Sequence, residues 1–130
     1  MLNLSIQDEY RARYTYENVL LVFGDLTPFS KIFQAEVKHV EAVSRLFATR
    51  GLTAPGSAWN PGNVPTFSSV KASCEAGIGA EITNYRMYEA FLLELQQAGT
   101  LPQDVSNVFN SLMEASRDQH LPAFEACAAR

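Results

Sequence analysis

The chain has 130 residues, of which 47% are hydrophobic and 18% charged, and its formal net charge is -4 at pH 7. This length and composition indicate one globular domain over 1–130, and the acidic balance gives no support to nucleic-acid binding. No apolar run approaches the roughly 18 residues of a membrane-spanning helix. The N-terminus lacks the basic and hydrophobic stretches of a secretion signal, so an exported form is expected to have lost its leader.

Two amphipathic helices are expected in the first part of the chain. Apolar residues recur at helical spacing over 6–23, after a capping-box pattern that begins at Ser5. A second helix is expected over 28–50, because Thr27-Pro28 is typical of a helix start and Gly51 of a helix end. The inward faces of these helices carry four polar or aromatic residues, which are Glu9, Tyr16, Glu36 and His39.

Residues 51–68 form an uncharged connection with three prolines and three glycines. A connection of this length is uncommon in a compact domain, but it suits a crossover that runs the length of a helical bundle. Such a crossover would leave the second and third helices parallel. The sequence therefore predicts an all-α fold, a four-helix bundle with a long crossover between helices two and three.

The third and fourth helices are expected over 69–99 and 100–128. Thr100 and Gln103 form another capping-box pattern at the start of the fourth helix, and Pro122 is expected to bend it beside His120. Their inward faces carry polar, aromatic and sulfur-containing residues: Cys74, Glu81, Tyr85, Tyr88, Ser116, His120 and Cys127.

The inward acids and imidazoles are expected to meet at one level of the bundle. Glu36 and His39 are three residues apart and share a helix face. Counting from the turns between antiparallel helices places Glu81 level with His120, and Glu9 within about a turn of His39. Because unpaired buried charge is costly, this convergence favours a metal site.

Cys74 and Cys127 are also expected at equal height on facing helices. Two alternatives stay open, a pair of free buried thiols and a disulfide that joins the third and fourth helices. The disulfide would imply an oxidising compartment, so the protein would be periplasmic or secreted. With free thiols, it would be cytoplasmic.

Three segments resemble the ferritin-like superfamily. The residues from Glu9 to Tyr16 resemble the E-x-x-A-R-x-x-Y stretch of rubrerythrin-type proteins, and those from Phe29 to His39 resemble the metal motif of their second helix. Residues 12–16, 29–43 and 116–124 are together similar to a family of small bacterial ferritin-like domains of undefined function. The resemblance covers nearly the whole chain and implies a ferritin-like bundle.

The resemblance also implies a dinuclear iron or manganese site. Carried over residue by residue, its ligands are Glu9, Glu36, His39, Glu81 and His120. The fourth helix departs from the pattern, because Arg117 stands where the family has a glutamate. The second metal position therefore lacks one bridging carboxylate, unless a π-bulge turns Asp118 or Glu114 inward.

The leading hypothesis is an oxidase or peroxidase whose di-iron or di-manganese centre reduces dioxygen or peroxide. Tyr16 and Tyr85 are candidate catalytic residues in this hypothesis, and core packing is the alternative for both. The rival hypothesis is a non-enzymatic bundle with a degenerate or mononuclear metal site, used for structure, sensing or partner binding. In that case Arg117 would supply the counter-charge to Glu81 or Glu36. A small-molecule pocket between the helices is a third hypothesis, and both a monomer and a homodimer stay open.

Overall fold

The computed structural model describes all 130 residues and contains helices but no strands. The helical bundle expected from the sequence is therefore confirmed. Its elements in chain order are α1 (Leu2–Phe23), α2 (Phe29–Thr49), α3 (Val70–Gln97), α4 (Gln103–Glu114), the π-helical segment η1 (Ala115–His120) and α5 (Leu121–Ala128). None of these helices combines the length and the apolar character needed to cross a membrane.

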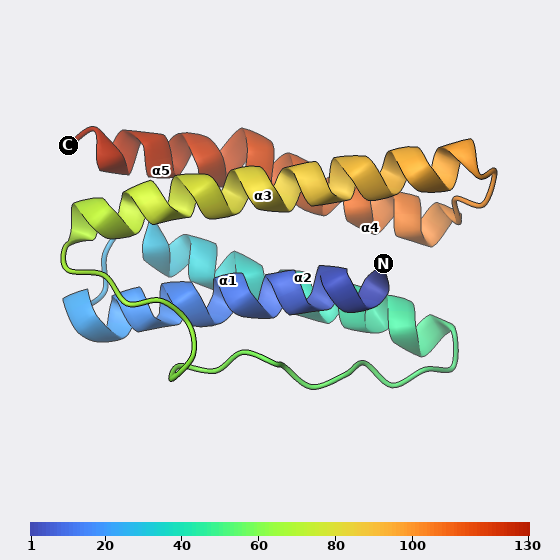
Figure 1. Ribbon diagram of the computed structural model, residues 1–130, viewed down its shortest axis with the longest axis horizontal. Helices are drawn as coiled ribbons and strands as arrows, with labels where there is room; N and C mark the ends of the chain where they lie inside the picture. The colour runs from blue at the N-terminus through green and yellow to red at the C-terminus, as the bar shows by residue number, and fades with distance from the viewer.

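The helices lie side by side along the long axis of the molecule (Figure 1). α1 and α2 form one antiparallel pair, and α3 forms another with the continuous α4–η1–α5 segment. The connection from α2 returns along α1 to the end where α3 begins, so α2 and α3 run in the same direction (Figure 1). Side chains of α1 hold this connection, as Tyr10 donates to the Pro55 carbonyl (3.1 Å) and Asn18 to the Pro61 carbonyl (2.9 Å).

Two helix starts differ from the sequence prediction. α1 begins at Leu2, before Ser5, and the Ser5 hydroxyl lies inside the bundle, 2.8 Å from the Tyr88 hydroxyl. α4 begins after Pro102, and no side chain caps it, so the capping box expected at Thr100 does not form. Both capping predictions are therefore wrong, because the tertiary environment decides whether a hydroxyl caps a helix.

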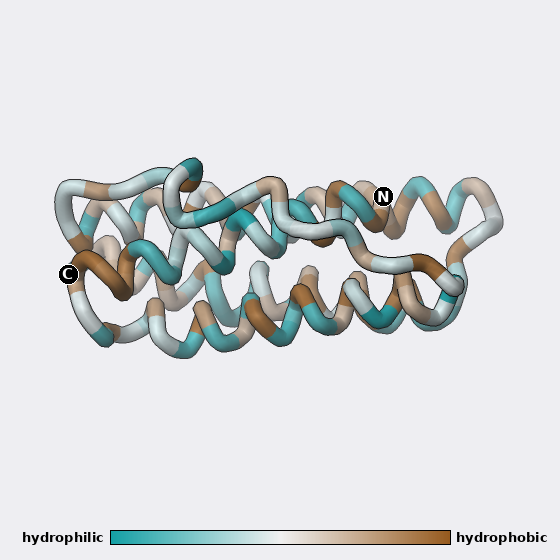
Figure 2. Tube along the Cα trace, turned by 90° about the horizontal axis from the view of Figure 1, so that it is seen from below, coloured by the Kyte–Doolittle hydropathy of each residue, from teal (hydrophilic) through white to brown (hydrophobic).

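Other helix ends agree with the expectation. Ser69 is the N-cap of α3, and its hydroxyl accepts from the Ala72 amide at 3.0 Å. Gly51 and Gly99 follow α2 and α3 with φ of 69°, the left-handed conformation that glycine tolerates best. Hydrophobic and hydrophilic stretches alternate along much of the helical tube, as the packing of amphipathic helices requires (Figure 2).

The core consists of two apolar clusters separated by a polar layer. One cluster contains Ile6, Val43, Tyr88 and Phe109, and the other contains Tyr16, Phe29, Cys74 and Phe124, each with further neighbours. In each helix of the bundle, the buried acids and imidazoles lie between residues of the first cluster and residues of the second. The polar layer is therefore enclosed by apolar packing at both ends.

The last helix carries a π-helical segment and a disulfide. Proline has no N–H, so Pro122 cannot complete the ordinary bond to the Asp118 carbonyl, and the wider turn of η1 lies directly before it. Beyond that turn, Cys127 of α5 bonds to Cys74 of α3, with Cα atoms 5.8 Å apart. The disulfide alternative for these cysteines is the one that forms.

Candidate metal centre

Five buried side chains from all parts of the bundle meet in the polar layer: Glu9, Glu36, His39, Glu81 and His120. Glu9 comes from α1, Glu36 and His39 from α2, Glu81 from α3, and His120 ends η1. The three glutamates are at most 2% exposed. These are the five residues that the sequence singled out, and the fold brings them together.

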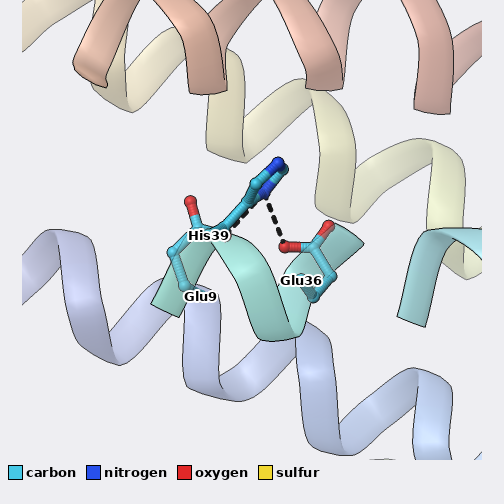
Figure 3. A group of neighbouring side chains, drawn as sticks. All are labelled: Glu9, Glu36 and His39. Atoms are coloured by element: carbon cyan, nitrogen blue, oxygen red, sulfur yellow. Dashed lines mark hydrogen bonds and ion pairs between the residues drawn. The ribbon is translucent and has the colours of Figure 1, made fainter. Parts of the chain in front are cut away.

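The first half of the centre joins α1 and α2. The His39 Nδ1 atom lies 3.1 Å from Glu36 Oε2 and 3.5 Å from Glu9 Oε2. Figure 3 shows His39 between the two carboxylates, with a dashed line to each. One atom from each of these three residues lies within 4.8 Å of the others, close enough to hold one metal ion.

The second half joins α2, α3 and η1. The His120 Nδ1 atom lies 3.3 Å from Glu36 Oε1 and 3.5 Å from Glu81 Oε1, and these three residues form a second group of the same size. Glu36 belongs to both groups and presents one oxygen to each imidazole. The His39 and His120 rings are stacked, with their centroids 5.6 Å apart. The centre is therefore two triads that share one carboxylate.

Hydroxyl and amide donors fix the carboxylates from outside. Tyr16 donates to Glu81 Oε1 at 2.8 Å, and Tyr88 donates to Glu9 Oε1 at 2.6 Å. Asn84 adds a longer bond to Glu9 Oε1 at 3.2 Å. Hydrogen bonds to ionised acceptors are among the stronger ones in proteins, so these donors orient the glutamates toward the imidazoles.

Burial and mutual contact change the protonation of the cluster. Burial, reinforced by the negative charge of Glu36, raises the pKa of Glu9 to about 7. Burial lowers the pKa of both imidazoles, but their close contacts with the carboxylates outweigh it and raise the pKa of His39 to about 10 and of His120 to about 9. Burial also opposes ionisation of Glu36, yet its contacts with His120 and His39 leave its pKa below the ordinary value. Without metal, the contacts with Glu9 and Glu36 therefore favour the protonated form of both imidazoles.

Two polar atoms of the cluster have no hydrogen-bond partner. These atoms are Glu9 Oε2 in the first triad and His120 Nδ1 in the second, and both are fully buried. Most buried polar atoms in proteins are satisfied, so unpartnered ones call for an explanation such as an ion. Carboxylate and imidazole donors suit ferrous iron or manganese. The residues present therefore fit a metal centre of this kind.

The fourth helix does not supply a further carboxylate. η1 is the π-helical distortion anticipated near His120, but Glu114 and Asp118 are both exposed. Besides His120, η1 turns Ser116 inward, and the Ser116 hydroxyl donates to Asn84 Oδ1 at 2.7 Å. Arg117 is also exposed and pairs with Asp118 at 2.7 Å, so it is not the counter-charge of Glu81 or Glu36. Both expectations for this region are corrected.

The two candidate catalytic tyrosines are placed differently. Tyr16 is buried and bonds Glu81, whereas Tyr85 is half-buried and makes none of the hydrogen bonds to the cluster. Tyr88, one turn further, provides the second tyrosine contact through Glu9. Asn84 is also buried beside Glu9, but it was not predicted because it lies off the apolar stripe of its helix. Its spacing of three residues from Glu81 was the available signal.

Comparisons of the chain with protein-family models, with curated proteins and with solved structures find no match.

Proposed function

We propose that the chain is a ferritin-like protein that holds two iron or manganese ions between Glu9, Glu36, His39, Glu81 and His120. The observation that carries this proposal is the pair of buried triads sharing Glu36, with Glu9 Oε2 and His120 Nδ1 left unpartnered. The long connection between α2 and α3 supports the ferritin-like assignment, because it leaves these helices parallel.

Two such ions would supply electrons for the reduction of dioxygen or peroxide, which is oxidase or peroxidase chemistry. The chain's own contribution is geometric and electrostatic. Glu36 presents one oxygen to each triad, and Tyr16 and Tyr88 hold Glu81 and Glu9 in position. The apolar clusters on either side keep bulk water from the layer, which strengthens every charge interaction inside it.

Anaerobic titration with ferrous iron tests the proposal. We expect saturation near two equivalents, and Glu36→Ala should lose most of the binding because both triads lose their shared ligand. Glu41→Ala is the matched control, since Glu41 lies on the same helix but is exposed. Absence of saturable binding, or equal binding by the two variants, contradicts the proposal.

A second candidate function is a non-enzymatic bundle in which protons replace the metal. The raised pKa values of His39 and His120, to about 10 and about 9, favour it, because imidazolium ions can balance the carboxylates without an ion. Such a bundle would serve a structural, sensing or partner-binding role. A melting temperature that neither chelator nor added metal changes supports this second candidate.

The Cys74–Cys127 disulfide is the feature that relates to the cellular location of the protein. Disulfides persist mainly in oxidising environments, so the Cys74–Cys127 bond supports a periplasmic or secreted location. Mass measurement of the purified protein under non-reducing conditions, before and after reduction and alkylation, determines whether the bond is present.

A further inference from the structure

We infer that a cavity between α1, α3 and the end of the α2–α3 connection binds a small uncharged organic molecule. The cavity has a volume of about 360 Å³, within the range of small-molecule sites. The connection crosses from α1 to α3 (Figure 1), and Pro65 and Phe67 near its end line the cavity. The inference goes beyond metal binding, because it concerns a separate space in the bundle.

The walls of the cavity are mostly apolar. Small residues on the two helices leave the space open, and the connection closes one side with a proline and an aromatic ring: Ala12, Pro65, Phe67, Ala76, Gly79 and Ala80. A β-carbon added at Gly79 would meet no heavy atom within 4 Å. Gly79 is exposed, so this open space lies at the solvent-facing mouth of the cavity and a larger side chain there would cover it.

The polar groups of the lining are largely occupied by one another. Asp8 accepts from Arg11 at 2.9 Å and from Asn84 at 2.7 Å. The Thr15 hydroxyl donates to the Arg11 carbonyl at 2.7 Å, and Tyr16 donates to Glu81. A charged ligand would have to compete with these pairs, whereas an uncharged one would leave them intact.

One hydroxyl of the lining is available to a ligand. Thr83 lies on the exposed rim of the cavity and takes part in none of the side-chain hydrogen bonds of the protein. The ligand class that fits is therefore a compact, mainly apolar molecule with a single hydrogen-bonding group, of which phenol is a simple example. Burial of its ring against alanine and phenylalanine side chains supplies the affinity, and Thr83 supplies the polar contact.

The cavity reaches the metal centre through one side chain. Tyr16 lines the cavity and also donates to Glu81 of the centre. A molecule held here would lie against the outer side of that tyrosine. That the bound molecule is a substrate of the metal centre rests on the proposed function. That the cavity binds the molecule does not rest on it.

Binding of phenol to the metal-free protein, followed by backbone amide NMR, tests the inference. We expect saturable shifts at Gly79 and Ala80, and at least tenfold weaker binding of benzoate and benzylamine. Gly79→Leu, which fills the cavity, should lose the shifts, and Thr83→Val should weaken binding several-fold. Ala90→Leu is the control, because Ala90 lies on the same helix and is exposed like Gly79, but it is outside the cavity.

Three results would overturn the inference. One is the lack of saturable shifts, and another is unchanged phenol binding by Gly79→Leu. The third is benzoate or benzylamine binding as tightly as phenol, which would mean that Arg11 or Asp8 governs the site. Metal stoichiometry is measured in a separate titration of the same variants, so failure of the metal centre and failure of the cavity are distinguished.

Discussion

Glu36 faces both imidazoles, and its neighbours determine how much negative charge the interior can hold. An isolated ionised carboxylate in an apolar core is very costly, yet three glutamates lie together here. His39 and His120 offset this charge on one side, and Tyr16 and Tyr88 donate hydrogen bonds on the other. Each residue of the cluster is therefore stabilised only by the presence of the others.

Replacement of Tyr88 by phenylalanine tests this dependence. The variant loses the 2.6 Å bond to Glu9, whose other oxygen already lacks a partner. We expect the free energy of unfolding of the metal-free protein to fall by about 1–3 kcal/mol in urea denaturation. Tyr85→Phe is the control and should change stability by less than about 0.5 kcal/mol, because Tyr85 has no bond to the cluster. Equal effects of the two variants would contradict the assignment.

The approach of α3 to α5 depends on one glycine. At Gly77, a β-carbon would lie 2.7 Å from the Phe124 ring, so only hydrogen fits between the helices there. The Cys74–Cys127 bond joins the same two helices one turn away. Because His120 directly precedes α5, this close packing also determines where its imidazole lies.

Alanine at Gly77 and at Gly79 should have opposite effects. In a helix interior, alanine is ordinarily more stable than glycine by about 0.5–1 kcal/mol. We expect Gly79→Ala to show this gain, since its β-carbon enters open space. Gly77→Ala should instead lower stability by about 1–3 kcal/mol, because the Phe124 ring must move. Thermal unfolding of the two variants measures this difference in stability. A Gly77→Ala protein that is more stable than the original would contradict the prediction, because it would show that α3 and α5 can move apart without loss of stability.

At the scale of the whole molecule, a charged layer divides the core. Apolar clusters on its two sides supply the hydrophobic stabilisation, while the layer itself responds to protons and to metal. A metal ion requires neutral imidazoles, so protons and metal compete for His39 and His120. The stability of the entire bundle is thereby coupled to pH.

The metal-free protein should become less stable as pH rises from about 6.5 to 9. His39 and His120 have folded pKa values of about 10 and about 9, above the ordinary 6.5, so the native state binds more protons than the unfolded state in this range. Their contribution is fully present below pH 6.5 and is lost as pH rises through the folded values. The raised pKa of Glu9, about 7, acts in the same direction.

Melting temperatures measured with chelator across this pH range check the prediction. The double variant His39→Gln/His120→Gln should show a flatter profile, because it lacks both imidazoles. Added ferrous or manganous ion should raise the melting temperature most at the alkaline end, where fewer protons must leave. A melting temperature of the metal-free protein that rises with pH would contradict the protonation assigned to these histidines.

The sequence by itself determined the helical bundle and the five residues of the candidate centre. Helical periodicity and the distance of each residue from its turn are local properties, and they place Glu81 level with His120, and Cys74 with Cys127. Only tertiary packing decided which of several neighbouring side chains is buried or contacts the cluster. It buried Ser5 against Tyr88, and it left Glu114 and Asp118 exposed although a π-helical turn forms beside them. It also selected Tyr88 over Tyr85 as the partner of Glu9, because such choices depend on contacts between helices that no local pattern encodes.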